Sequence, residues 1–86
     1  MLKLGNMDAE RIDRLGALAA HVVQHALASG LSWDEAVLGF GIAAKALAAK
    51  ASDQGAGSLE QCATLAERRL KSGMEQSADV LRAWLR

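Results

Sequence analysis

Apolar residues recur every three or four positions along most of the chain, and short polar segments interrupt this repeat. Residues 7–28 alternate between an apolar stripe and charged positions, which predicts an amphipathic helix. Residues 33–51 contain almost no polar face and carry two apolar stripes, so they predict a helix that is packed on two sides. The same spacing in residues 59–71 and 73–85 predicts two further helices.

Serines followed three residues later by Glu or Gln mark the expected helix starts. In this capping box each side chain satisfies a backbone N–H of the first turn. The pairs are Ser32 with Glu35, Ser58 with Gln61, and Ser72 with Glu75; glycines that favour helix C-caps are Gly30, Gly55 or Gly57, and Gly73. We therefore predict an all-α fold, a small antiparallel bundle of four helices in a single domain over residues 1–86. If the break at Ser72-Gly73 is only a kink, the last two helices are continuous and the bundle has three.

The composition supports this fold class and narrows the environment. Apolar residues make up 51% of the chain, aromatic residues only 3%, and proline is absent, which favours helices over strands. Ten basic and ten acidic residues cancel, so we expect no general attraction to nucleic acid or to an anionic membrane. The longest apolar run, residues 36–44, is well short of a membrane span, and the first residues lack the apolar segment of a signal peptide. With a single cysteine, the chain is expected to be cytoplasmic.

The segment "GFGIAAK", residues 39–45, has the spacing G-x-G-x-x-A of a dinucleotide-binding turn. Such a turn needs a strand before its glycines and a helix after them. Here Gly39 follows the expected helix start at Ser32, so no strand precedes it. We therefore expect no bound cofactor.

The longer segment "GLSWDEAVLGFGIAAKAL" resembles the helix-turn-helix of sigma-like and response-regulator DNA-binding domains. The matching residues are Gly30, Leu31, Ser32, Glu35, Gly41 and Ile42. The resemblance implies a turn at Gly41, a recognition helix after it, and a role as a DNA-binding regulator. That helix would have only Lys45 and Lys50 to hydrogen-bond base edges, because its other residues are mostly alanine. Residues 30–50 thus form either this motif or one helix.

We prefer one helix, in which the glycines leave room for neighbouring helices to approach closely on both sides. The interaction surface is then expected to include Trp33, Val37, Phe40 and Gly41, together with Trp84 of the last helix.

Two histidines are the candidate metal ligands. His21 and His25 are four residues apart and would share one face of the first helix, as in many metal sites. A metal ion needs at least a third ligand, and the alternative is a structural pair beside the apolar stripe. Cys62 falls on the apolar stripe of the third helix, and no serine or cysteine has an identifiable base, so we expect no enzymatic activity.

These patterns together favour a small cytoplasmic helical module for protein–protein interaction, of unknown pathway, with a homodimer as one form of that interaction. The alternatives are a helix-turn-helix DNA-binding regulator and a small helical protein that binds a metal or another ligand.

Overall fold

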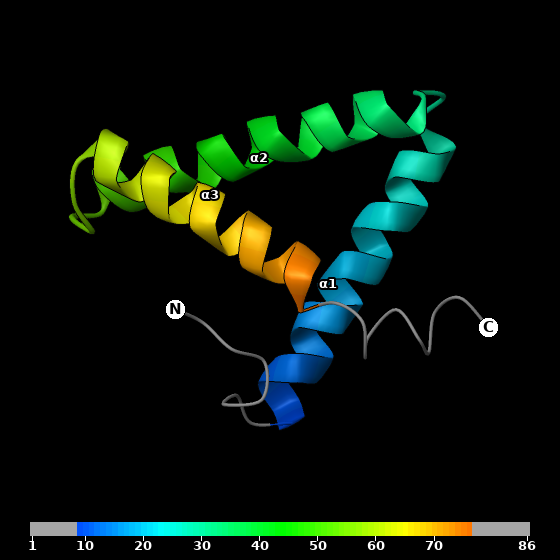
Figure 1. Ribbon diagram of the computed structural model, residues 1–86, viewed down its shortest axis with the longest axis horizontal. Coiled ribbons are helices and arrows are strands. Elements are labelled where there is room, and N and C mark those ends of the chain that lie inside the picture. The colour runs from blue at the N-terminus through cyan, green and yellow to red at the C-terminus, as the bar shows by residue number, and fades with distance from the viewer. Residues whose placement is uncertain (1–8, 77–86) are drawn as a thin grey trace.

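The computed structural model describes residues 9–76, and these form three helices: α1 (Ala9–Ala28), α2 (Trp33–Asp53) and α3 (Leu59–Glu75) (Figure 1). The described residues contain no strand, so the all-α class is confirmed. The break predicted at Ser72-Gly73 is wrong, because α3 runs through both residues without interruption. Most of the predicted fourth helix lies outside the described residues, so the four-helix count is not confirmed.

Two of the three predicted capping boxes begin helices. The Ser32 N–H donates to Glu35 Oε1 (2.9 Å) at the start of α2, and the Ser58 N–H donates to Gln61 Oε1 (2.9 Å) at the start of α3. The left-handed φ of +82° at Gly30 and +90° at Gly55 confirms both as turn glycines after a helix. The third pair, Ser72 and Glu75, lies within α3 and therefore caps no helix start.

α2 and α3 form a tightly packed hairpin. The loop between them is held by a hydrogen bond of 2.9 Å from the Ser52 hydroxyl to the Gly57 carbonyl, and by one of 3.0 Å from the Ala56 N–H to the Ala51 carbonyl. The covered face of α2 repeats every four residues and consists of Ala36, Phe40, Ala44 and Ala48. Three of these four side chains are alanines, which allow two helix axes to come close together.

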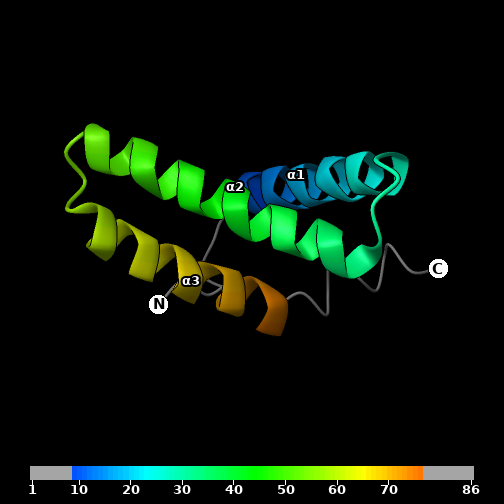
Figure 2. The same cartoon turned by 90° about the horizontal axis from the view of Figure 1, so that it is seen from above.

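α1 packs far less closely against α2 than α3 does. It leaves the turn before α2 at a steep angle, and Figure 2 shows it behind α2, on the other side from α3. No residue of α1 is buried. The described helices therefore form a hairpin with a diverging third helix, and the predicted antiparallel bundle is not closed.

The core of the described residues is very small. Its buried apolar members are Ala36 (8% exposed) and Ala48 (6%), and Ser72 is the buried polar residue. The fold of the described residues thus leaves many large apolar side chains in contact with solvent.

Candidate interaction surface

Large apolar side chains are exposed on all three helices. They are Leu15, Leu18, Val23, Leu27, Leu31, Trp33, Val37, Leu38, Ile42, Leu47, Leu59, Leu65, Leu70 and Met74. Single exposed apolar residues are common on protein surfaces, but contiguous apolar patches mark sites of interaction. A candidate interaction surface is therefore one where several of these side chains lie next to one another.

The clearest continuous surface lies on the side of α2 that faces away from α3. Leu38, Ile42 and Ala46 are four residues apart, so they lie along one line of the helix. They are displaced by two residues from the covered face, which rotates them about 200° around the helix axis. Leu38 is 69% exposed and Ile42 is 68% exposed. We call these three residues the outer stripe.

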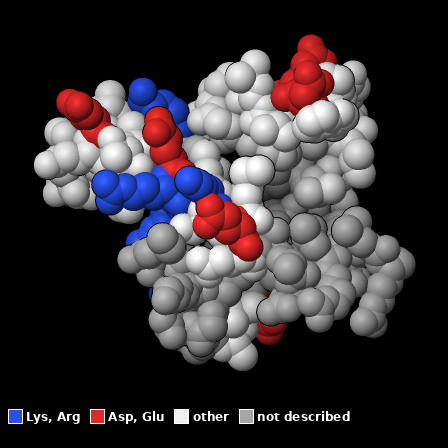
Figure 3. Space-filling view, in the orientation of Figure 1, with Lys and Arg blue, Asp and Glu red and all other residues white. Residues whose placement is uncertain are grey.

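Charged residues border the outer stripe at its two ends. Asp34 and Glu35 precede Leu38 by about one helical turn, and Lys50 follows Ala46 by another, so these charges lie at the two ends of the stripe. Asp34 lies beside Glu35, and Lys45 flanks the stripe. Figure 3 shows acidic atoms gathered over the start of α2, at upper right, and a largely uncharged surface next to them. α2 is therefore acidic at its beginning and basic in its second half.

The acidic end is fixed by hydrogen bonds to Ser32. The Ser32 hydroxyl lies 2.7 Å from Asp34 Oδ1 and 2.8 Å from Glu35 Oε1, and its one proton serves one carboxylate at a time. This hydroxyl lowers the pKa of Asp34, and the Ser32 N–H, followed by the hydroxyl, lowers the pKa of Glu35. Both carboxylates are stabilised in their charged form.

The predicted interaction residues fall into three groups. Trp33, Val37 and Gly41 are exposed. Phe40 is half-buried on the covered face of α2, and Trp84 lies outside the described residues. Leu38 and Ile42 were not among the predicted interaction residues. The apolar spacing of residues 33–51 places them together on one of the two stripes of this helix, and that stripe was the signal that could have identified them.

The glycines of α2 differ from their expected environment. Gly39 and Gly41 lie inside the continuous helix, so the helix-turn-helix expected as the alternative for residues 30–50 is wrong. A Cβ placed on either glycine would meet nothing within 4 Å. Within residues 9–76, therefore, no neighbouring helix packs closely against either glycine, contrary to our prediction.

The predicted metal ligands gain no partner in the described part of the chain. His21 and His25 are both exposed on α1. No group of three or more His, Cys, Asp or Glu side chains that could hold a metal ion occurs among residues 9–76. Cys62 is half-buried.

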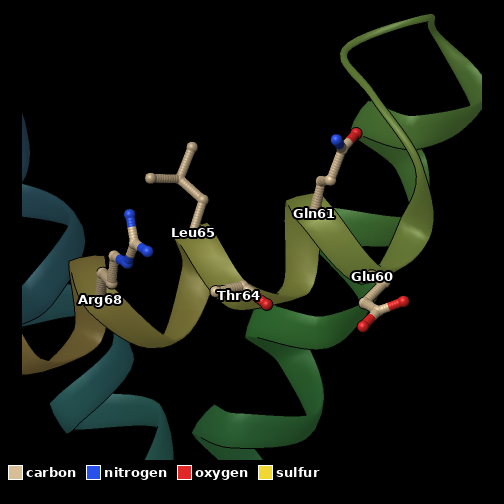
Figure 4. Close-up of a pocket in the computed structure, with 5 residues that line it drawn as sticks. All are labelled: Glu60, Gln61, Thr64, Leu65 and Arg68. Carbon is tan, nitrogen blue, oxygen red and sulfur yellow. The ribbon is translucent and has the colours of Figure 1, made fainter.

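The shallow hollow on α3 is lined by side chains of that helix alone. Figure 4 shows Glu60, Gln61, Thr64, Leu65 and Arg68 fanning out along α3 instead of converging on one point. A binding pocket needs polar groups that converge within a concave apolar wall. The hollow is therefore an open helix surface.

No helix in the described residues is long and apolar enough to cross a membrane. None of the comparisons with family models, with curated proteins or with solved structures finds a match.

Proposed function

We propose that this chain is a small helical protein–protein interaction module that completes its apolar core by packing against helices of another protein molecule. The observation that carries the proposal is the contrast between its buried and exposed residues. The buried apolar residues in the described part of the chain are two alanines, while large apolar side chains are exposed on every helix.

Energetics support this role. Full burial of one Leu, Ile or Val side chain contributes about 1.5–3 kcal/mol. Ordering each residue of the backbone costs about 1–2 kcal/mol, and a small domain is stable only when its apolar burial offsets that cost. Ala36 and Ala48 have one side-chain carbon each, so much of the burial free energy that the large apolar side chains of residues 9–76 could supply is still to be gained. A partner that covers the exposed stripes supplies it.

The module is proposed to act in the cytoplasm and without catalysis, on the basis of its single cysteine and the lack of an identifiable base for a nucleophile.

Of the two alternatives, the DNA-binding one loses its structural element, since α2 is continuous. The start of α2 also carries Asp34 and Glu35, which would repel the phosphate backbone. The metal-binding alternative has only His21 and His25 in its favour.

The test is the native size of the protein in an extract of its own cells. We expect the tagged chain, at its natural abundance, to elute in a complex heavier than its own 9.1 kDa. The double variant Leu38→Asp with Ile42→Asp should elute as a monomer, because two buried charges cannot be tolerated in an apolar contact. Elution of the unmodified chain as a monomer would contradict the proposal.

A further inference from the structure

We infer that the partner of the outer stripe is a second copy of this chain, with the two α2 helices packed antiparallel across a two-fold axis near Ile42. This inference rests on the proposed function and names the partner of the same surface. A two-fold contact uses one patch twice, so the patch must be complementary to itself in access, shape and charge.

The outer stripe is accessible to another helix along its length. In Figure 1 both α1 and α3 lie below α2, and in Figure 2 they lie on its two sides. No other described helix lies above α2 in Figure 1. Leu38 and Ile42 are each about two-thirds exposed.

The shape of the stripe is self-complementary when the helices run in opposite directions. Leu38 is one turn before Ile42 and Ala46 is one turn after it. A two-fold axis near Ile42 places the large Leu38 of each copy opposite the small Ala46 of the other. Helix surfaces interlock when the large side chains of one helix face the small side chains of the other.

The charges select the same direction. Glu35 and Lys50 lie nearly equal distances before and after Ile42 along the helix. Antiparallel packing brings Glu35 of each copy to Lys50 of the other, whereas parallel packing would bring like charges together. The two Ser32 hydrogen bonds to Glu35 both end on Oε1, so Oε2 is the oxygen that would accept from a lysine. Antiparallel packing also opposes the two helix dipoles.

A net charge of zero further favours pairing with an identical chain, since ten acidic and ten basic residues give no net repulsion between copies.

The first experiment is sedimentation equilibrium of the purified full chain over a range of concentrations. We expect the mass to rise from 9.1 kDa towards twice that value. Ile42→Asp should weaken the dimer by about tenfold or more. The matched control is Leu65→Asp, a similar change at an exposed position of α3, which should leave the dimer intact. Helical circular dichroism of both variants shows that they still fold.

The second experiment tests the direction of packing by disulfide formation in a Cys62→Ser background. Ile42→Cys should cross-link to its own copy. Ala46→Cys alone should not, because antiparallel helices place the two copies of this position about 12 Å apart along the axis. A mixture of the Leu38→Cys and Ala46→Cys chains should cross-link to each other. A cross-link of Ala46→Cys to itself would show parallel packing and overturn the inference.

Two further outcomes would overturn it. One is a purified chain that stays monomeric at all concentrations, and the other is a dimer that survives Ile42→Asp. If the purified chain is monomeric but the chain in extracts still elutes in a heavier complex that Leu38→Asp with Ile42→Asp abolishes, the self-pairing inference fails and the proposed function stands. If the extract also contains only monomer, both fail.

Discussion

The backbone N–H of Ser32 donates to Oε1 of Glu35 over 2.9 Å, while the N–H of Glu35 points back to the Ser32 hydroxyl over 3.4 Å. The same reciprocal arrangement joins Ser58 and Gln61 at the start of α3, where the returning bond is shorter, 3.1 Å. These pairs set the residue at which each helix of the hairpin begins.

Removing a capping serine should destabilise the helix that it starts. We expect Ser32→Ala and Ser58→Ala each to lower the free energy of unfolding by about 1 kcal/mol, because each leaves a first-turn N–H without its acceptor. Denaturant melts followed by circular dichroism measure this change. Thr64→Ala, at an exposed position inside α3, is the control and should be neutral or slightly stabilising. Equal losses in all three variants would show that the caps contribute nothing specific.

The start of α2 should become less stable in acid. The pKa values of Asp34 and Glu35 are lowered in the folded chain by hydrogen bonds from Ser32, so the charged carboxylates favour folding. This contribution is fully present above the ordinary carboxyl range, at about pH 5 and higher. It declines as the pH falls through the unfolded and then the lowered folded pKa values. Thermal melts between neutral pH and about pH 2.5 measure it.

The Ser32→Ala variant is the control for that pH dependence. Without the hydroxyl, the difference in melting temperature between neutral and acidic solution should be smaller than in the unmodified chain. An unchanged difference would assign the acid sensitivity to other carboxylates.

Gly41→Ala should stabilise the chain. Gly41 is helical and exposed, and an added Cβ meets no atom within 4 Å, so the helix gains about 1 kcal/mol of propensity with no steric cost. Gly41→Asn should gain less, because asparagine is a weaker helix former than alanine. Gly30→Ala is the contrasting variant: its φ of +82° strains any side chain, so stability should fall. Asn more stable than Ala at position 41 would mean that residue 41 is not helical in solution.

The exposed ion pair of α1 should contribute very little. Arg14 Nη2 lies 2.6 Å from Glu10 Oε1, but both side chains are more than 70% exposed to solvent. Such pairs typically contribute less than about 0.5 kcal/mol and are screened by salt. We expect Arg14→Ala to shift the denaturant midpoint only slightly, and less still in high salt. A large, salt-independent loss would mean that Arg14 contacts something beyond Glu10.

Local signals predicted the helices well, and long-range packing was not predictable from them. The capping pairs at Ser32 and Ser58 and the turn glycine Gly30 act within a few residues, so their outcome can be read from the sequence. The Ser72 pair has the same pattern but lies in the interior of α3, where the helix continues past it. A capping box satisfies a helix start but does not by itself end the preceding helix.

The candidate surface was predicted only in part, for a related reason. Periodicity shows that α2 has two apolar stripes but not which face of the helix α3 covers. The covered positions, Ala36, Phe40, Ala44 and Ala48, follow neither stripe. Val37 and Leu47 of the stripe that contains Phe40 are exposed, and so are Leu38 and Ile42 of the other. Which face is covered depends on the angle of the loop at residues 54–58, which no periodic pattern encodes. We expected α1 to complete an antiparallel bundle, and it does not. Its direction is set in the turn at Gly30, and a periodic pattern does not encode that angle either.

At the buried alanines, positions 36 and 48, a larger side chain should be more harmful than a smaller one, which is the reverse of the usual case in a protein core. In most domains the harmful substitution shortens a large buried side chain and leaves a void. Here the buried apolar positions already hold nearly the smallest side chain, so shortening has little left to remove. Enlargement is the harmful direction: Ala48→Leu would force α2 and α3 apart, at a typical cost of about 1–3 kcal/mol. Only glycine, alanine and serine are therefore expected to fit at positions 36 and 48 without displacing a neighbouring helix.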